Sequence, residues 1–191
     1  VRKFPDVKIV NLGGGYKIDR MNSENSINLQ EVFSVIKKEF QRFTDDTDNT
    51  IHLEIEPGTY LSANSCMLLT KVNDIVDTGV DGYTFLKIDS SMTELIRPMM
   101  YGAVHPMRLL TGSETGEKEY VVVGCCCESG DIFTVAEGDP EQVAVIKLPQ
   151  AQISDLMAIM GTGAYGVSMS AKNYNSRPVC AEAMIHADNS Y

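Results

Sequence analysis

One short turn in the sequence carries a thiol and two carboxylates. The segment Cys127-Glu128-Ser129-Gly130-Asp131 lies between two apolar runs, and these groups can donate and accept protons. Cysteine is also a common buried residue, and the preceding Cys125 and Cys126 are most simply interpreted as strand or core residues. The residue types alone therefore leave proton transfer and core packing both open for Cys127.

Two glycine-containing loops offer backbone N–H groups to an anion. Gly13-Gly14-Gly15 ends an apolar run, and its backbone can approach a phosphate closely because no Cβ atoms intervene. In Glu56-Pro57-Gly58, the Glu56 carboxylate suits a protonated ring nitrogen, and the Gly58 N–H suits a phosphate. The alternative is a pair of plain tight turns with a solvated glutamate.

Two further segments carry groups that suit a small ligand. Arg97 and Tyr101 are four residues apart, so a helical or turn backbone can direct both toward one side, where a guanidinium and a phenol suit a carboxylate. Tyr165, between Ala164 and Gly166, can be presented from a close-approaching backbone. For Arg97 and Tyr101 the alternative is a surface arginine and a tyrosine packed at the domain edge. His105, directly before a proline, is more simply a structural hydrogen-bonding residue.

The elements around the glycine loops form a strand, a helix and a strand. Residues 7–12 form an apolar run and residues 52–56 alternate polar and apolar side chains, as strands do. Between them apolar residues recur at helical spacing from Leu29 onward, after the capping pattern Asn28 to Glu31. This order predicts a parallel βαβ unit with both loops at one end of its strands.

After residue 66 the pattern changes to short β-type runs separated by turns that contain Gly, Asp and Pro. The runs predict an antiparallel sheet or barrel, with helical or loop-like stretches at residues 153–160 and 163–174 and a further strand at 177–185. The predicted strands are residues 68–75, 82–88, 119–124, 131–135 and 142–148. We therefore expect two domains, residues 1–66 and 67–191, with a ligand site between them.

Composition excludes several functional classes. The 191 residues carry 16 basic and 26 acidic side chains, a net charge of −10, which argues against binding to nucleic acid. No apolar run reaches 18 residues, so no membrane span is expected. Five cysteines, three of them consecutive, favour a reducing cytoplasm over disulfides. No Cys and His spacing predicts a metal site.

In their order along the chain, these motifs resemble the diaminopimelate decarboxylase family of pyridoxal-phosphate-dependent enzymes. The resemblance extends to residues 173–178, which are similar to the family's closing segment. It implies a TIM-type (β/α)₈ barrel that binds pyridoxal phosphate, followed by a β-barrel or sandwich domain like the C-terminal domain of alanine racemase. It also implies a homodimer with shared active sites. Residues 1–66 would be the last part of the barrel and residues 67–191 the β-domain.

The resemblance also implies roles for individual residues. Gly13, Gly14, Gly15 and Gly58 would hold the cofactor phosphate, and Glu56 would pair with the pyridine nitrogen. Cys127 would donate a proton to the carbon that loses carbon dioxide, and both Cys127 and Glu128 would reach the partner subunit's site. The substrate would contact Arg97, Tyr101, Glu128 and Tyr165, and Tyr165 would also contact the cofactor.

Two departures from the family pattern affect the expected activity. Thr59 stands where diaminopimelate decarboxylases usually have arginine after Glu-Pro-Gly, a difference shared with carboxynorspermidine decarboxylases. The lysine that binds the cofactor covalently lies in the family's first barrel strand, which this sequence lacks, and Lys172 lies at the wrong end of the fold to replace it. We therefore expect an inactive fragment of an enzyme that converts meso-2,6-diaminopimelate to L-lysine. The alternatives are another amino-acid decarboxylase, a racemase, and a non-catalytic dimerisation or regulatory homologue.

Overall fold

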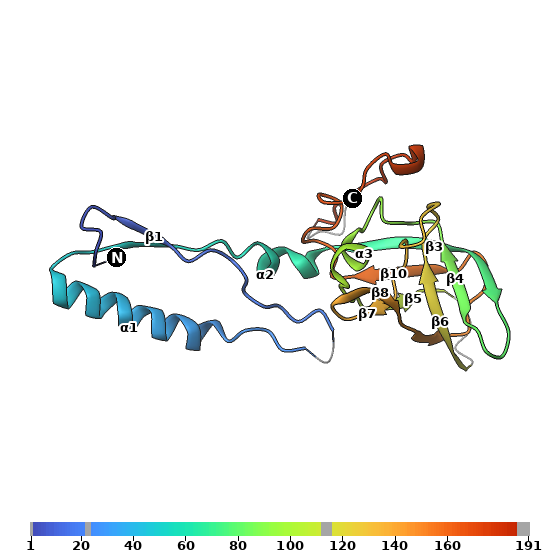
Figure 1. Ribbon diagram of the computed structural model, residues 1–191, viewed down its shortest axis with the longest axis horizontal. Coiled ribbons are helices and arrows are strands. Elements are labelled where there is room, and N and C mark those ends of the chain that lie inside the picture. Colours follow the sequence, from blue (N-terminus) through green and yellow to red (C-terminus); the bar gives the residue numbers. More distant parts are fainter. Residues whose placement is uncertain (1, 22–23, 112–115, 187–191) are drawn as a thin grey trace. The chain divides into compact units, whose positions relative to one another are not determined.

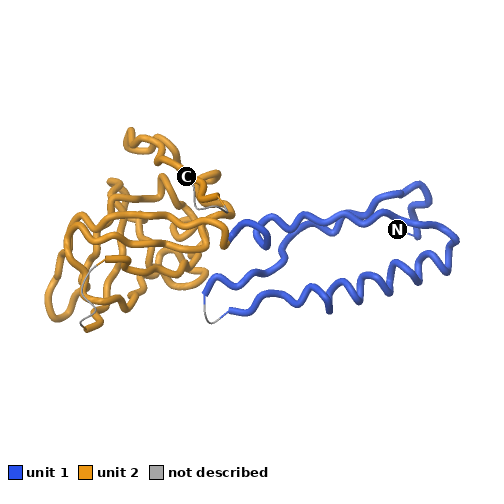
Figure 2. The backbone as a smooth tube through the Cα atoms, turned by 180° about the vertical axis from the view of Figure 1, so that it is seen from behind, with its two compact units in different colours: residues 1–63 blue, residues 64–191 orange. Residues whose placement is uncertain are grey.

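The chain divides into two units, residues 1–63 and residues 64–191 (Figure 2). We analyse a computed structural model, which describes residues 2–21, 24–111 and 116–186. None of the described helices combines the length and the apolar character that a membrane crossing requires.

The first unit contains the predicted βαβ arrangement. Strand β1 (Ile9–Asn11) pairs in parallel with β2 (His52–Glu54), and helix α1 (Leu29–Thr47) connects them (Figure 1). The Asn28 side chain caps α1 by accepting hydrogen bonds from the N–H groups of Gln30 (3.1 Å) and Glu31 (3.4 Å). The helix ends at Asp48, which has a left-handed backbone (φ 50°) and donates its N–H to the Thr44 carbonyl. The cap and the strand pairing confirm the local prediction.

No residue of α1 is buried within the first unit. Its apolar row is only partly covered; Phe33, for example, stacks against Tyr16 with 5.9 Å between the ring centroids. A helix of a βαβ unit normally buries such a row against a larger sheet. Two paired strands are too few to provide that surface.

The second unit is built on one six-stranded sheet, with short helices α3 (Arg97–Tyr101) and η2 (Tyr174–Ser176) beside it. Its edge strands β5 and β9 lie close to each other, so the sheet is nearly closed. A further pair is formed by β7 (Val135–Ala136) and β8 (Asp139–Val143). In spatial order the six strands are β5 (Met107–Leu109), β10 (Leu156–Met160), β3 (Met67–Asp77), β4 (Thr84–Ile88), β6 (Glu117–Val123) and β9 (Ile146–Pro149).

The core of this unit consists of apolar side chains from β3, β4, β6, β9 and β10 together with residues from the loops between them. Because alternate residues of a strand point to opposite faces, Leu86 and Ile88 of β4 are fully buried while Lys87 between them is exposed. The other buried members are Val72, Leu95, Tyr120, Val122, Phe133, Leu148, Ala151, Met157 and Ile159.

Five details of the predicted β-domain are wrong. The sheet is mixed, because β4 and β6 pair in parallel; a long crossover through α3 and β5 separates them. Residues 156–160 form strand β10 between β5 and β3, although we predicted a helical or loop-like stretch there; a short apolar run fits either element. Residues 142–148 belong to two strands, and residues 131–135 form only a bridge at Ile132 and the start of β7. Residues 177–185 contain no strand.

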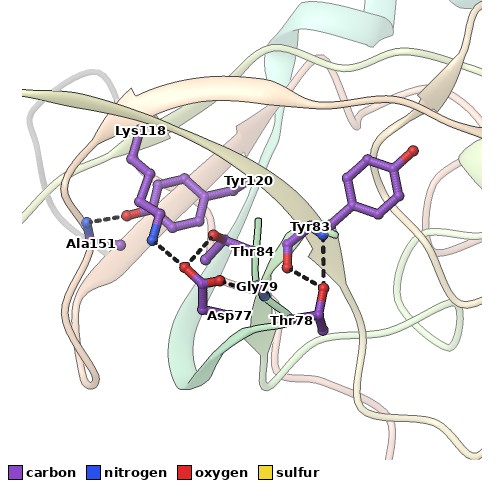
Figure 3. Close-up of polar contacts among 8 residues, drawn as sticks. All are labelled: Asp77, Thr78, Gly79, Tyr83, Thr84, Lys118, Tyr120 and Ala151. Atoms are coloured by element: carbon purple, nitrogen blue, oxygen red, sulfur yellow. Dashed lines mark hydrogen bonds and ion pairs between the residues drawn. The ribbon is translucent and has the colours of Figure 1, made fainter. Parts of the chain in front are cut away.

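The hairpin between β3 and β4 shows how polar side chains hold the strands in register (Figure 3). The Thr78 hydroxyl accepts the Tyr83 N–H at 2.8 Å and donates to the Tyr83 carbonyl at 2.9 Å. The Asp77 carboxylate accepts from the Gly79 N–H at 2.9 Å and from Lys118 Nζ on β6 at 2.9 Å. The hydrogen bond from the Gly79 N–H lowers the pKa of Asp77 most, and the contact with Lys118 lowers it further.

Candidate functional site

The two loops of the first unit lie next to each other, as the parallel strand pairing predicts. The Glu56 N–H donates to the Gly13 carbonyl at 2.8 Å. A Cβ atom on Gly14 would lie 2.5 Å from the Glu56 carbonyl oxygen, closer than any real contact of this kind. Gly13 and Gly15 have left-handed φ angles of 71° and 82°. Only glycine fits position 14 without displacing the Glu56 loop, and the left-handed neighbours also favour glycine.

Asn11 connects these two loops, and the sequence analysis did not identify it. Its Oδ1 accepts the Gly13 N–H at 2.7 Å, and its Nδ2 donates to the Glu56 carboxylate at 2.8 Å. One amide therefore fixes both the glycine loop and the Glu56 side chain. The available signal was an asparagine at the end of a strand, two residues before a tight turn, where such side chains commonly bond to the following backbone.

The glycine loop has the features of an anion cradle. Within the described residues, the N–H groups of Gly14 and Gly15 make no hydrogen bond, and Gly14 has no room for a side chain. The N–H of Gly58, which we expected to bind phosphate, instead donates to the Glu56 carbonyl at 2.9 Å. Gly14 and Gly15 are therefore the donors that fit a phosphate, and Glu56 beside them fits a protonated ring nitrogen.

In the second unit, Asp131 organises the turn that carries Cys127 and Glu128. It is 4% exposed, and its carboxylate accepts the N–H groups of Met92 at 2.7 Å and Cys126 at 2.9 Å. Burial raises the pKa of Asp131, while these N–H groups oppose the rise. Asp131 therefore supports the turn, on which Cys127 is exposed and Glu128 is half-buried.

Residues from the end of the chain contact both reactive side chains of this turn. Tyr174 donates its hydroxyl to Glu128 at 3.1 Å, and Asn175 Oδ1 accepts the Cys127 N–H at 2.8 Å. The pKa of Glu128 is lowered, first by the Gly130 N–H and then by the Tyr174 hydroxyl. Glu128 is thus kept as a carboxylate, the form that attracts a cationic amine.

Cys125 differs from Cys127 in burial and in chemistry. Its Sγ donates to the Asp89 carbonyl at 3.1 Å, and burial raises the pKa of its thiol to about 11. A thiol with such a pKa is a poor proton donor near neutral pH and a poor nucleophile. Cys125 is therefore a structural residue, and Cys127 is the exposed thiol of the cysteine run.

Helix α3 carries the candidate carboxylate-binding pair. Arg97 and Tyr101 are its first and last residues, and Tyr101 is 52% exposed. The Arg97 guanidinium donates to Nε2 of His105 at 3.0 Å, and Nδ1 of His105 donates to the Met160 carbonyl at 2.9 Å. Because arginine only donates, His105 is neutral with its proton on Nδ1. His105, 1% exposed, is the structural residue that we predicted, and it also holds Arg97.

Tyr165 extends from a constrained loop. Its backbone is left-handed (φ 56°), and its side chain is 53% exposed. A Cβ atom on the following Gly166 would overlap the Thr162 carbonyl oxygen, so this position requires glycine. The loop therefore presents the tyrosine outward from a backbone that leaves little freedom.

The second unit brings three of the motifs into one neighbourhood. A Cβ atom on Gly130 would lie 3.5 Å from Met99 of α3, so α3 lies beside the turn. The loop after Tyr165 contacts the segment before α3 through a hydrogen bond from the Ile96 N–H to Ser170 Oγ (3.2 Å). Among the described residues, no three His, Cys, Asp or Glu side chains cluster as a metal site.

Comparison with known proteins assigns these features to a family. Residues 16–163 match the family described as pyridoxal-dependent decarboxylase, C-terminal sheet domain. The chain belongs to this pyridoxal-dependent decarboxylase family. The matched residues include all six strands of the nearly closed sheet, and the family relationship implies pyridoxal phosphate as the cofactor.

Several relatives of this chain within the pyridoxal-dependent decarboxylase family are diaminopimelate decarboxylases. It is 33% identical over 184 residues to the enzyme of Escherichia coli (strain K12), which covers 94% of this chain and 43% of that protein. A crystal structure of diaminopimelate decarboxylase matches with a TM-score of 0.84 and 32% identity, over 94% of this chain and 43% of that one. The diaminopimelate decarboxylase from Helicobacter pylori, complexed with L-lysine, matches with a TM-score of 0.71 and 29% identity, over 89% and 37%. The chain thus spans less than half the length of these relatives.

Proposed function

We propose that the full-length protein containing this chain decarboxylates meso-2,6-diaminopimelate to L-lysine with pyridoxal phosphate. The main support is that the relatives matching nearly the whole chain are diaminopimelate decarboxylases, one of them complexed with L-lysine. The observation that carries the chemistry is the turn at Cys127 and Glu128, where an exposed thiol lies beside a carboxylate whose pKa is lowered.

In this proposal the first unit binds the cofactor. The phosphate would accept hydrogen bonds from the N–H groups of Gly14 and Gly15, with Gly13 and Gly58 shaping the two loops. Glu56 would pair with the protonated pyridine nitrogen, and Asn11 would hold the Glu56 carboxylate in place. When bound, the cofactor ring withdraws electrons from the substrate carbon. A carboxylate beside the ring nitrogen favours the charged form of the ring that does this best.

The second unit supplies the groups that bind substrate and transfer a proton. Arg97 and Tyr101 would hold the distal carboxylate of diaminopimelate, because a guanidinium supplies paired donors for it. Glu128 would attract the distal amine. Tyr165 would contact both cofactor and substrate. The Cys127 thiol would donate its proton to the α-carbon after carbon dioxide leaves.

The remainder of the enzyme follows from the same family relationship. A TIM-type barrel would extend the parallel pair β1 and β2 and cover the partly exposed apolar row of α1, which has no buried residue here. A homodimer would allow Cys127 and Glu128 to reach the partner subunit's active site. The five free cysteines favour a reducing cytoplasm as its location.

The alternative substrate is carboxynorspermidine, and Thr59 is the observation that favours it. Thr59 cannot supply the positive charge that diaminopimelate decarboxylases usually have after Glu-Pro-Gly. Arg97 and Tyr101 favour diaminopimelate instead, because its distal end carries a carboxylate.

The test is decarboxylation by a full-length protein that includes the cofactor-binding lysine. We expect carbon dioxide and L-lysine from meso-diaminopimelate, a much slower reaction with carboxynorspermidine, and a large loss of kcat in Cys127→Ala. Lys172→Ala is the control and should retain activity. Preference for carboxynorspermidine, or a loss of cofactor binding in Lys172→Ala, would overturn the assignment. A lysine-bearing protein that releases no carbon dioxide from either substrate, or forms D-amino acids, would support the non-catalytic or the racemase alternative.

A further inference from the structure

We propose that residues 173–176 form a clamp that positions the turn at Cys127 and Glu128, so that Tyr174 and Asn175 are positioning residues for proton transfer. The role of the clamp in proton transfer rests on the proposed function. The contacts that define the clamp lie within the second unit and do not depend on that function.

The clamp holds the turn at two consecutive positions with two consecutive residues. Tyr174 donates to the Glu128 side chain at 3.1 Å, and Asn175 accepts from the Cys127 main chain at 2.8 Å. One bond fixes the direction of the carboxylate and the other fixes the backbone from which the thiol extends. Together the two bonds restrain the Glu128 carboxylate and the backbone that carries the Cys127 thiol.

The backbone of the clamp is unusual in a way that serves these contacts. Asn173, Asn175 and Ser176 have φ angles of 66°, 50° and 57°, in the left-handed region that non-glycine residues rarely adopt. Asparagine tolerates this region best among the larger residues, because its short amide can bond locally. Three such residues within four positions produce a tight coil that directs the side chains of Tyr174 and Asn175 to the same turn.

The clamp is anchored to the loop that also anchors the turn. Arg177, the residue after the clamp, donates to the Asp89 carbonyl at 2.9 Å, and Ala171 before it donates its N–H to the Met92 carbonyl at 3.4 Å. The same Met92 donates its N–H to Asp131 of the turn at 2.7 Å. The clamp and the turn are therefore both hydrogen-bonded to the same segment, which follows β4 and contains Met92.

The charges in this contact support a directional role. The Glu128 carboxylate raises the pKa of the Tyr174 phenol, because the hydrogen bond between them favours the protonated form that donates. In return the hydroxyl contributes to the lowered pKa of Glu128, after the Gly130 N–H. A segment that only closed the fold would not require a hydroxyl at this point, since phenylalanine would pack equally well.

Two measurements on the 191-residue chain test the clamp. The first is the pKa of Glu128, followed by carboxyl ¹³C NMR. We expect Tyr174→Phe to raise it, whereas the control Tyr83→Phe leaves it unchanged, because the Tyr83 hydroxyl makes no hydrogen bond among the described residues. An unchanged Glu128 pKa in Tyr174→Phe would overturn the role of Tyr174.

The second measurement is hydrogen exchange at the Cys127 amide. Asn175→Gly keeps the left-handed backbone but removes the acceptor, and we expect exchange to accelerate about 3- to 10-fold, the usual effect of one lost hydrogen bond. Asn175→Asp keeps the acceptor and should restore protection. The Cys126 amide, which donates to Asp131, is the internal reference and should not change. Equal exchange at Cys127 in both variants would overturn the role of Asn175.

Neither readout depends on cofactor or substrate, so the clamp and the proposed function can fail separately. If the lysine-bearing protein releases no carbon dioxide while both readouts respond as expected, the clamp stands and the decarboxylase assignment falls. If decarboxylation occurs but neither readout responds, the clamp falls and the assignment stands.

Discussion

Gly124 lies against the buried Asp131 carboxylate that organises the turn at Cys127 and Glu128, and replacing Gly124 with alanine tests the role of that carboxylate. A Cβ atom on Gly124 would lie 2.5 Å from Cγ and Oδ1 of Asp131 and would overlap its Oδ2. The carboxylate has little space to move, because Asp131 is 4% exposed and bonded to the N–H groups of Met92 and Cys126. In Gly124→Ala the carboxylate must therefore leave these donors.

The size of the effect follows from the bonds that are lost. A hydrogen bond to a charged group contributes about 1.5–3 kcal/mol, so loss of both bonds costs roughly 3–6 kcal/mol. Alanine restricts the unfolded chain and offsets about 0.4–1 kcal/mol of this. We therefore expect Gly124→Ala to lower the free energy of unfolding of the second unit by about 2–6 kcal/mol, a large change for a single added methyl group.

Urea unfolding followed by circular dichroism measures this loss, and hydrogen exchange locates it. Protection of the Met92 and Cys126 amides should fall by roughly 30-fold or more, since about 1.4 kcal/mol corresponds to a factor of ten. Gly130→Ala in the same turn is the matched control: its Cβ would meet Met99 at 3.5 Å, an ordinary contact. If Gly124→Ala and Gly130→Ala unfold within about 0.5 kcal/mol of each other, the surface-mutation range, the reasoning is refuted.

Three further predictions concern other supports of the site. Gly14→Ala should separate the two loops of the first unit, because its Cβ would lie 2.5 Å from the Glu56 carbonyl oxygen. Hydrogen exchange of the Glu56 amide should then accelerate about 10-fold or more. Protection of this amide unchanged from the wild type would contradict the prediction. His105→Leu should lower the free energy of unfolding by about 2–4 kcal/mol, and His105→Gln should lower it by less, because an amide oxygen can still accept a hydrogen bond from Arg97. Urea unfolding of the two variants measures this difference. Equal losses would show that the bond to Arg97 contributes nothing to stability. Burial raises the pKa of Cys125 from 9.0 to about 11, so the protonated thiol contributes fully to stability below pH 9, and this contribution is lost as the pH rises through 11. Between pH 8 and pH 10.5, the free energy of unfolding measured in urea should fall less in Cys125→Ala than in the wild type. Equal falls in the two proteins would exclude Cys125 as the cause.

Local patterns in the sequence predicted the first unit well. The capping pattern at Asn28, the helical spacing after it and the two short strands all depend on residues within a few positions of one another. The physical determinants of these elements are local, so sequence reasoning could reach them.

The second unit was harder because its strands are defined by pairing across long distances. Residues 156–160 contain a buried apolar triplet, Met157 to Ile159, which suits a helix as well as a strand. They became a strand because they pair on both sides, with β5 and with β3. The parallel pairing of β4 and β6 likewise depends on the crossover between them. Tertiary context determined both outcomes.

The hydrogen-bonding supports of the candidate site escaped prediction for the same reason. The residues proposed to react, Cys127, Glu128 and Glu56, could be chosen as candidates from the sequence because they lie in short motifs whose composition is informative by itself. Their hydrogen-bonding partners are 45 to 48 positions away along the chain, a separation at which spacing carries no information. These pairs are Glu56 with Asn11, Glu128 with Tyr174, and Cys127 with Asn175.

Separation along the chain also predicts where substitutions will be tolerated. A side chain that only supports a reactive residue must match its partner in hydrogen-bonding capacity, whereas the reactive residue must match the substrate. A change at Asn11 or Tyr174 can therefore be compensated by a new donor from a neighbouring element, but a change at Glu56 or Glu128 removes the group itself. Asn11→Asp illustrates the difference: it replaces the donor to Glu56 with a second carboxylate at 2.8 Å, so the two charges repel and the Glu56 side chain must turn away, while the Glu56 carboxylate itself remains.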